Sequence, residues 1–176
     1  MSGGANMQQT GAATAFQTGT RWASGRLGRL VVVRLAPRED VKRAIEAIAE
    51  AEGLAGALIL GGAASLRRVT LRNVRVAPER WPITDSNRIW TTLEGPLELV
   101  SIMGNISRWP DGRPFVHAHV VVSTGRPDGV AYGGHLVDGA EVLTAGELAL
   151  AEVLEVRMRR DRDPGTLGEE LFPDTT

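Results

Sequence analysis

The sequence predicts an α/β protein of the α+β type, in which a largely antiparallel sheet packs against one main helix. Short runs of strand-forming residues recur along most of the chain and are separated by turn-forming Gly, Pro and Asp. One stretch alone carries apolar residues clearly at helical spacing. A chain of 176 residues can bury one core. We therefore expect a compact single domain over residues 25–158, between a disordered N-terminal tail (1–24) and a charged C-terminal tail (159–176).

The first half of this domain is predicted to hold one helix among strands. Residues 28–35 are apolar on both faces and rich in valine, which is typical of a central strand. The apolar residues then follow a period of 3.6, and acidic residues at the start and a glycine at the end predict a helix over 39–53. Residues 56–62 and 66–74 are predicted as two strands joined by a hairpin-like step at 63–65.

The second half is predicted to be mostly strand. An irregular connection containing proline leads to strands at 88–95, 97–107 and 115–124, which a Gly-Pro turn and a longer Pro- and Gly-containing turn separate. Residues 141–158 fit a period of 2 and a period of 3.6 equally well. The pattern alone therefore leaves this segment open between strand and helix.

The composition narrows the classes of function. The chain has no cysteine, which excludes disulfides, thiolate metal sites and cysteine nucleophiles and is compatible with a reducing compartment. No apolar run approaches the roughly 18 residues of a membrane span, and the first 20 residues lack the pattern of a signal peptide. We expect a cytoplasmic protein without membrane contact.

Charge is balanced overall but uneven along the chain. Residues 1–114 hold 15 basic and 10 acidic residues, whereas residues 115–176 hold 5 and 11. With a pI near 6.3, binding to nucleic acid would depend on a local basic patch, for which Arg21, Arg26 and Arg29 are the candidates. The alternative is a solvated arm followed by an ordinary strand with charged ends.

Several familiar motifs are absent or incomplete. Gly-Arg-Pro occurs at 112–114 and 125–127, but neither copy has the preceding arginine that an AT-hook lays into the minor groove. Asp, Gly and Pro at these places predict turns between strands. No nucleophile elbow occurs, and the glycines at 61–62 are not followed by the residues that a phosphate-binding loop requires.

The three histidines give the strongest functional signal. His117 and His119 alternate on a predicted strand, so both point to one face, about 6.5–7 Å apart along the chain. His135 follows a Gly-Gly pair on what we expect to be the returning strand. Three His ligands with one open position are typical of a reactive zinc or iron site. The alternative is a set of hydrogen-bonded histidines within a trimer.

The order of motifs resembles the plants-and-prokaryotes conserved (PPC) domain, in its prokaryotic single-domain type without an AT-hook. The resemblance spans about residues 26–157 and rests on VVRLAPRED, GALILGGAASLRRVTLRN, GPLELVSIMGNIS, HAHVVVS and GGHL. It implies a compact antiparallel α/β domain that forms homotrimers, and it implies that residues 144–156 are the closing strand. It also implies partner contact near Gly95, Glu98 and Asn105, although Pro96 and Leu97 replace the Arg and Phe of plant members.

Two functions follow from these observations. The first is a homotrimeric PPC-domain module for assembly, with weak and non-specific DNA binding by analogy with plant members, whose PPC domain follows AT-hooks. The second is a metal-dependent enzyme that acts on a small molecule at His117, His119 and His135.

Overall fold

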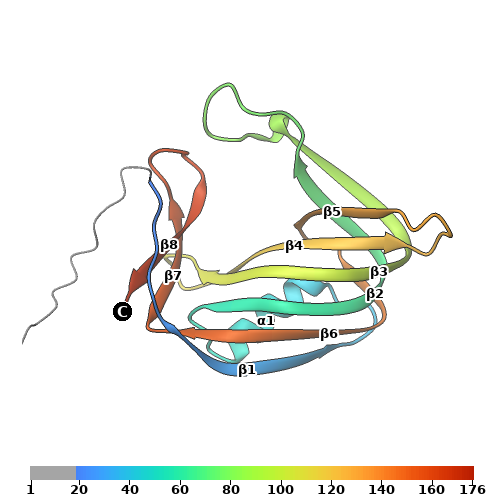
Figure 1. Cartoon of the computed structure of the whole chain (residues 1–176), viewed down its shortest axis with the longest axis horizontal. Helices are drawn as coiled ribbons and strands as arrows, with labels where there is room; N and C mark the ends of the chain where they lie inside the picture. Colours follow the sequence, from blue (N-terminus) through green and yellow to red (C-terminus); the bar gives the residue numbers. More distant parts are fainter. Residues whose placement is uncertain (1–18) are drawn as a thin grey trace, which may run out of the picture.

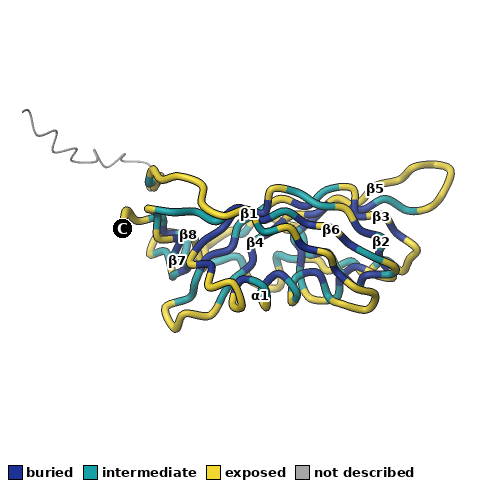
Figure 2. Tube along the Cα trace, turned by 90° about the horizontal axis from the view of Figure 1, so that it is seen from below, coloured by how far each residue is buried: buried dark blue, intermediate teal, exposed yellow. Residues whose placement is uncertain are grey.

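The protein is described by a computed structural model, which covers residues 19–176. In these residues eight strands form one sheet, in the order β1-β6-β2-β5-β4-β3-β7-β8, and α1 packs against one face of it (Figures 1 and 2). The elements are β1 Arg26–Leu35, α1 Val41–Ala51, β2 Ala57–Val74, the 3-10 turn η1 Asp85–Asn87, β3 Arg88–Arg108, β4 Pro114–Thr124, β5 Ala131–Leu136, β6 Glu141–Leu154, β7 Val156–Arg162 and β8 Glu169–Thr175.

The predicted fold class is confirmed. All strand pairings among residues 19–176 are antiparallel except β3 with β7, which meet in parallel at Arg108 and Arg159. The predicted helix is present but begins at Val41, because Asp40 caps it: its side chain accepts a hydrogen bond from the Arg43 amide at 3.0 Å. It ends before Gly53, which has a φ of 63°. Its buried face consists of Val41, Ile45 and Ala49.

β2 and β3 are continuous strands, so two predicted turns were wrong. Residues 63–65 lie inside β2, and the Gly-Pro pair at 95–96 lies inside β3. The two strands pair with each other on both sides of a register shift between Leu66 and Arg68, where both change direction together. A Cβ on Gly95 would lie 2.4 Å from the Leu66 carbonyl oxygen. The small residues at 63–65 and 95–96, which suggested chain reversals, instead allow the backbones of β2 and β3 to approach closely where both strands bend.

These long strands close part of the sheet into a ring. β2 pairs with β3 along one edge and with β5 along the other, and β4 joins β5 to β3. Aliphatic side chains from the four strands are buried, among them Val69, Leu71, Leu97, Val122 and Leu136. The ring therefore holds β4 and β5, the two strands that carry the histidines, in fixed register.

The position of β1 differs from the sequence prediction, and that of β6 agrees with the resemblance. β1 lies at the edge of the sheet, not at its centre, and pairs only with β6 among the described strands. Its second apolar face stays open, with Leu30 62% and Val32 76% exposed. The ambiguous segment forms a strand, β6, which lies between β1 and β2.

The C-terminal segment is a hairpin and not the expected tail. Residues 159–176 contain most of β7 and all of β8, which pair along their whole length. Met158, Arg160 and Phe172 are buried, and the charged residues between them face outward. The many charged residues of this segment concealed the alternation of buried and exposed residues that is typical of a strand. The predicted disordered tail falls largely on residues 1–18, which lie outside the described residues; residues 19–25 have no regular secondary structure.

Candidate metal centre

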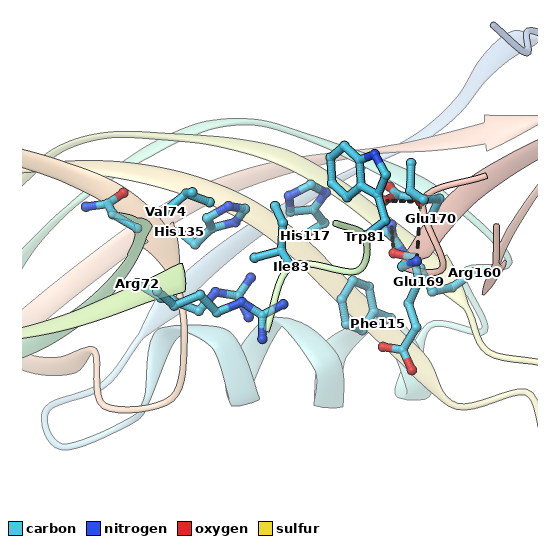
Figure 3. Close-up of a pocket in the computed structure, with 14 residues that line it drawn as sticks. Arg72, Val74, Trp81, Ile83, Phe115, His117, His135, Arg160, Glu169 and Glu170 are labelled. Carbon is cyan, nitrogen blue, oxygen red and sulfur yellow. Dashed lines mark hydrogen bonds between the residues drawn. The ribbon is translucent and has the colours of Figure 1, made fainter. Parts of the chain in front are cut away.

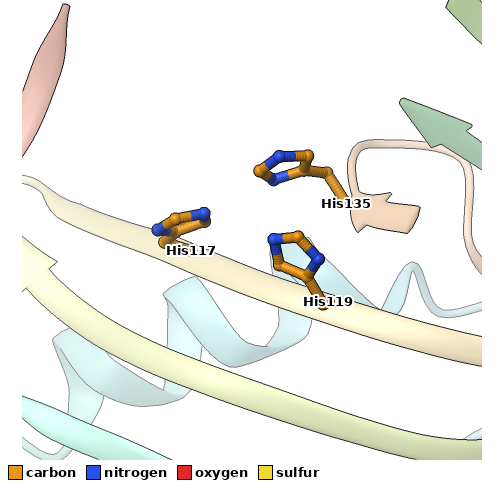
Figure 4. A group of neighbouring side chains, drawn as sticks. All are labelled: His117, His119 and His135. Carbon is orange, nitrogen blue, oxygen red and sulfur yellow. The ribbon is translucent and has the colours of Figure 1, made fainter. Parts of the chain in front are cut away.

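The three histidines form one cluster, as the sequence predicted (Figure 4). His117 and His119 project from the same face of β4, and β5 places His135 directly opposite His119. The ring centroids of His119 and His135 lie 4.1 Å apart, and that of His117 lies 5.6 Å and 5.2 Å from them. One ring nitrogen of each residue lies within 4.8 Å of the other two.

The alternation of β4 places this cluster on the side of the sheet opposite α1. Val116, Ala118 and Val120 are buried in the core, so the residues between them face outward. His119 is exposed, and His117 and His135 are half-buried. The cluster is therefore accessible to an ion or a small molecule from solvent.

The surroundings favour neutral imidazoles. Burial lowers the pKa of His117, and the positive charges of Arg160 and neighbouring residues lower it further. Burial, His119 and Arg72 lower the pKa of His135 to about 4. Metal ions bind the neutral form of histidine, so at neutral pH His117 and His135 are ready to act as ligands.

A cavity of about 270 Å³ adjoins the cluster, and His117 and His135 form part of its wall (Figure 3). Other walls come from the connection between β2 and β3 and from the β7–β8 hairpin, which brings distant segments to the histidines. Three arginines, two glutamates and several apolar side chains line the cavity: Arg72, Arg88, Arg160, Glu169, Glu170, Val74, Trp81, Ile83 and Phe115.

None of these three arginines was predicted as a site residue from the sequence. Arg72 is the register partner of His135 on β2, and the Arg160 guanidinium lies 4.4 Å from the centroid of Phe115, which precedes the histidines on β4. Both contacts depend on strand pairings between segments distant in sequence. No local pattern at these arginines distinguishes them from the other surface arginines of the chain.

Of the three partner-contact candidates, Asn105 alone lies beside the histidines. It is the register partner of His117 on the neighbouring strand, and its side-chain oxygen is buried without a hydrogen-bond partner. Glu98 is exposed and pairs with Ser123, further along β3. Gly95 lies at the bend of β3 and lines a separate cavity.

The three N-terminal arginines already have partners within the chain. Arg26 forms an ion pair with Glu155 at 2.6 Å, and Arg29 forms ion pairs with Glu152 and Glu52 at 3.0 and 3.1 Å. The guanidinium of Arg21 lies over the Phe172 ring, 4.7 Å from its centroid. Phosphate contacts would have to compete with these partners.

Fold and site together define a compact α/β domain that presents three histidines beside an arginine-lined cavity on an otherwise open sheet face. The family model of the Plants and Prokaryotes Conserved domain (PCC, also written PPC) matches residues 23–154. The chain belongs to this family, as its motifs indicated. No helix among residues 19–176 has the length and apolar character needed to cross a membrane.

Solved structures of similar proteins share this fold. A protein from Archaeoglobus fulgidus, described as metal-containing, is 25% identical, with a TM-score of 0.71 over 87% of this chain and 99% of that one. A PPC protein from Pyrococcus horikoshii is 27% identical, with a TM-score of 0.69 over 89% of this chain and 99% of that one. The described fold is therefore that of this family.

Among curated proteins, the bifunctional protein GlmU from two Synechococcus strains is 32% identical over 138 residues. The match covers 78% of this chain but 19% of the cyanobacterial protein. The similarity therefore concerns one segment of a much longer protein.

Proposed function

We propose that this PPC-domain protein binds a divalent metal, zinc or iron, through His117, His119 and His135. The convergence of three imidazole nitrogens within 4.8 Å of one another carries the proposal. Bound to one ion of this kind, the nitrogens would be about 3–3.4 Å apart at bond lengths near 2.0–2.1 Å, which small side-chain rotations can achieve. The metal-containing relative from Archaeoglobus supports this function.

Three protein ligands leave one coordination position open, and this distinguishes a reactive site from a closed structural one. When bound, the ion would lower the pKa of a water molecule at that position or polarise a small molecule that binds there. The cavity beside His117 and His135 has room for such a molecule. This geometry favours action on a small molecule. The chain's own residues would hold and orient both the ion and that molecule.

Asn105 is proposed to orient the cluster. Its side-chain oxygen lies next to His117 on the sheet face that carries the histidines. The oxygen is buried by its neighbours and accepts no hydrogen bond. Histidines that bind metals usually donate the second ring N–H to an oxygen acceptor, which fixes the tautomer and the ring orientation. We therefore expect Asn105 to act as a positioning residue and not as a ligand.

The His119→Ala variant tests the metal site, with Ser123→Ala as a control on the same face of β4. Both proteins are purified without nickel resin, stripped with a chelator and exposed to Zn²⁺. We expect elemental analysis to find about one ion per chain in the native protein and the control, and at most a tenth of that in His119→Ala, because two ligands hold zinc weakly. Equal metal content in all three would rule out these ligands.

We also propose that the protein assembles as a homotrimer, as the resemblance to the family implies. The outward face of the sheet supports assembly, because Leu30, Leu58 and Met103 are exposed there on three different strands. Exposed apolar side chains grouped on one face are typical of interaction sites. Weak, salt-dependent DNA binding and a cytoplasmic location remain part of the proposal; the ion pairs of Arg26 and Arg29 favour at most non-specific contact with phosphates.

A further inference from the structure

Arg160 is a buried guanidinium with unused donors. It is 2% exposed, and its Nε and Nη2 atoms have no hydrogen-bond partner. Only Nη1 donates, to the carbonyl oxygen of Glu169 at 3.3 Å. A buried charge without an acceptor is unfavourable, and Arg160 lines the cavity beside His117. An anionic ligand in that cavity would supply the acceptor that the guanidinium lacks.

Arg72 is a second guanidinium in the same cavity without an acceptor. Within residues 19–176 the Arg72 side chain makes no hydrogen bond or ion pair. Burial and the positive charge of Arg88 lower its pKa. Arg88 itself is held by Asp85 at 3.1 Å. In Figure 3, Arg72 lies beside His135 toward one end of the cavity and Arg160 lies toward the other, with His117 between them.

We propose that this cavity binds a small organic anion whose carboxylate or phosphate groups contact Arg72 toward one end and Arg160 toward the other, beside the three histidines. The planar guanidinium presents parallel N–H donors that match the oxygens of either group. The side chains of Val74, Trp81 and Ile83 line the cavity and offer an apolar wall to the rest of the molecule.

Electrostatics links this anion to the metal. A divalent ion at the histidines would be repelled by Arg72 and Arg160, whose charges already lower the pKa of His117. An anion that contacts both arginines removes this repulsion, so metal and anion should each strengthen the binding of the other. This coupling rests on the proposed function, whereas binding of the anion alone requires only the arginines.

Glu169 and Glu170 limit the charge of the ligand. Both line the cavity near Arg160, but neither forms an ion pair with it. Two carboxylates and a volume of about 270 Å³ do not suit a polyanion such as a nucleic acid. The site instead fits a molecule of metabolite size with an anionic group near each arginine.

Calorimetry on the metal-free, full-length protein tests the proposal with inorganic phosphate and succinate as probes. We expect at least one of them to bind saturably. Arg160→Met and Arg72→Met keep an apolar stem but remove the guanidinium, and each should weaken binding at least tenfold. Arg113→Met is the matched control, since Arg113 is exposed on a turn and pairs only with Asp111 at 2.8 Å.

The outcomes separate this proposal from the metal site. Binding of phosphate alone or of succinate alone supports the proposal and identifies the anionic group. No binding of either probe, or equal affinity in the native protein and a folded Arg72→Met, overturns it even if zinc still binds. Loss of zinc binding in His119→Ala leaves this result unaffected, because the calorimetry contains no metal. Circular dichroism shows whether Arg160→Met folds; if it does not, Arg72→Met decides.

Discussion

His135 combines a half-buried ring with positive neighbours, and this makes the free energy of unfolding depend on pH. Its pKa is about 4 in the folded protein and near 6.5 in an unfolded chain. As pH falls below 6.5 the unfolded chain binds a proton first, so stability is full above that value and is lost progressively down to about pH 4.

We therefore expect the metal-free native protein to lose about 2 kcal/mol of stability between pH 7 and pH 4.5 through this residue, after allowance for partial solvent screening. The His135→Gln variant has no titrating ring and should show a smaller loss. Urea unfolding at pH 7, 5.5 and 4.5 measures the difference. A variant as sensitive to acid as the native protein would contradict this assignment.

At this scale the sequence predicted the histidines but not their neighbours. His117 and His119 could be placed together because alternation along one strand is local, and the Gly-Gly pair before His135 indicated a close return. Arg72 and Arg160 reach the same cavity through pairings of β2 and through the β7–β8 hairpin. Such contacts follow from topology, which no single segment encodes.

Among the elements, α1 is attached to the end of β3 by one arginine. Arg108 donates to the carbonyl oxygen of Leu54 at 2.7 and 2.9 Å, to that of Ala49 at 2.9 Å and to that of Gly112 at 2.9 Å. Ala49 and Leu54 flank the helix end, where carbonyl groups lack partners within the helix. The guanidinium thus joins the helix end, β3 and the turn after it.

Replacing Arg108 by Ala should cost about 2–4 kcal/mol of stability, because several partly buried carbonyl groups lose a charged donor at once. Arg113→Ala, on the same turn but exposed, should change the free energy of unfolding by less than about 0.5 kcal/mol. Chemical denaturation of both variants at pH 7 measures the effect. Equal stability of the two would show that water replaces the Arg108 contacts at little cost.

Prediction of the elements succeeded where the signals were local. The helix was located correctly because Asp40 and Gly53 mark its ends. The bends of β2 and β3 were mistaken for turns, because Ala, Ser, Gly and Pro suit both a reversal and a close crossing of strands. The β7–β8 hairpin was missed because Met158 and Phe172 are few among many charges.

Across the whole molecule, the uneven charge of the sequence is matched in part by ion pairs within the fold. Basic residues of the first part meet acidic residues of the last part, as in Arg29 with Glu152 and Arg67 with Glu141. Lys42 and Arg43 both contact Asp138. The asymmetry that suggested phosphate binding in the sequence is thus used in part for contacts between β1, α1, β2 and the later strands.

The outward face of the sheet carries apolar side chains that the single chain leaves exposed. Strand register places one row of residues across β1, β6, β2, β3 and β4: Leu30, Ala151, Leu58, Asn105 and His117. The apolar part of this row therefore leads directly to the histidine cluster. A second copy seated on it would lie next to the proposed metal.

We expect light scattering to give about three times the 18.8 kDa mass of one chain, because a trimer would cover this row. Leu58→Asp places a charge in the middle of the row and should shift the protein toward monomers at micromolar concentration, since an interface core does not tolerate an unpaired carboxylate. Val76→Asp is the control, because Val76 is exposed in the connection after β2 and lies off the row. A native protein that remains monomeric, or a Leu58→Asp variant that assembles as well as Val76→Asp, would show that this face is not the interface.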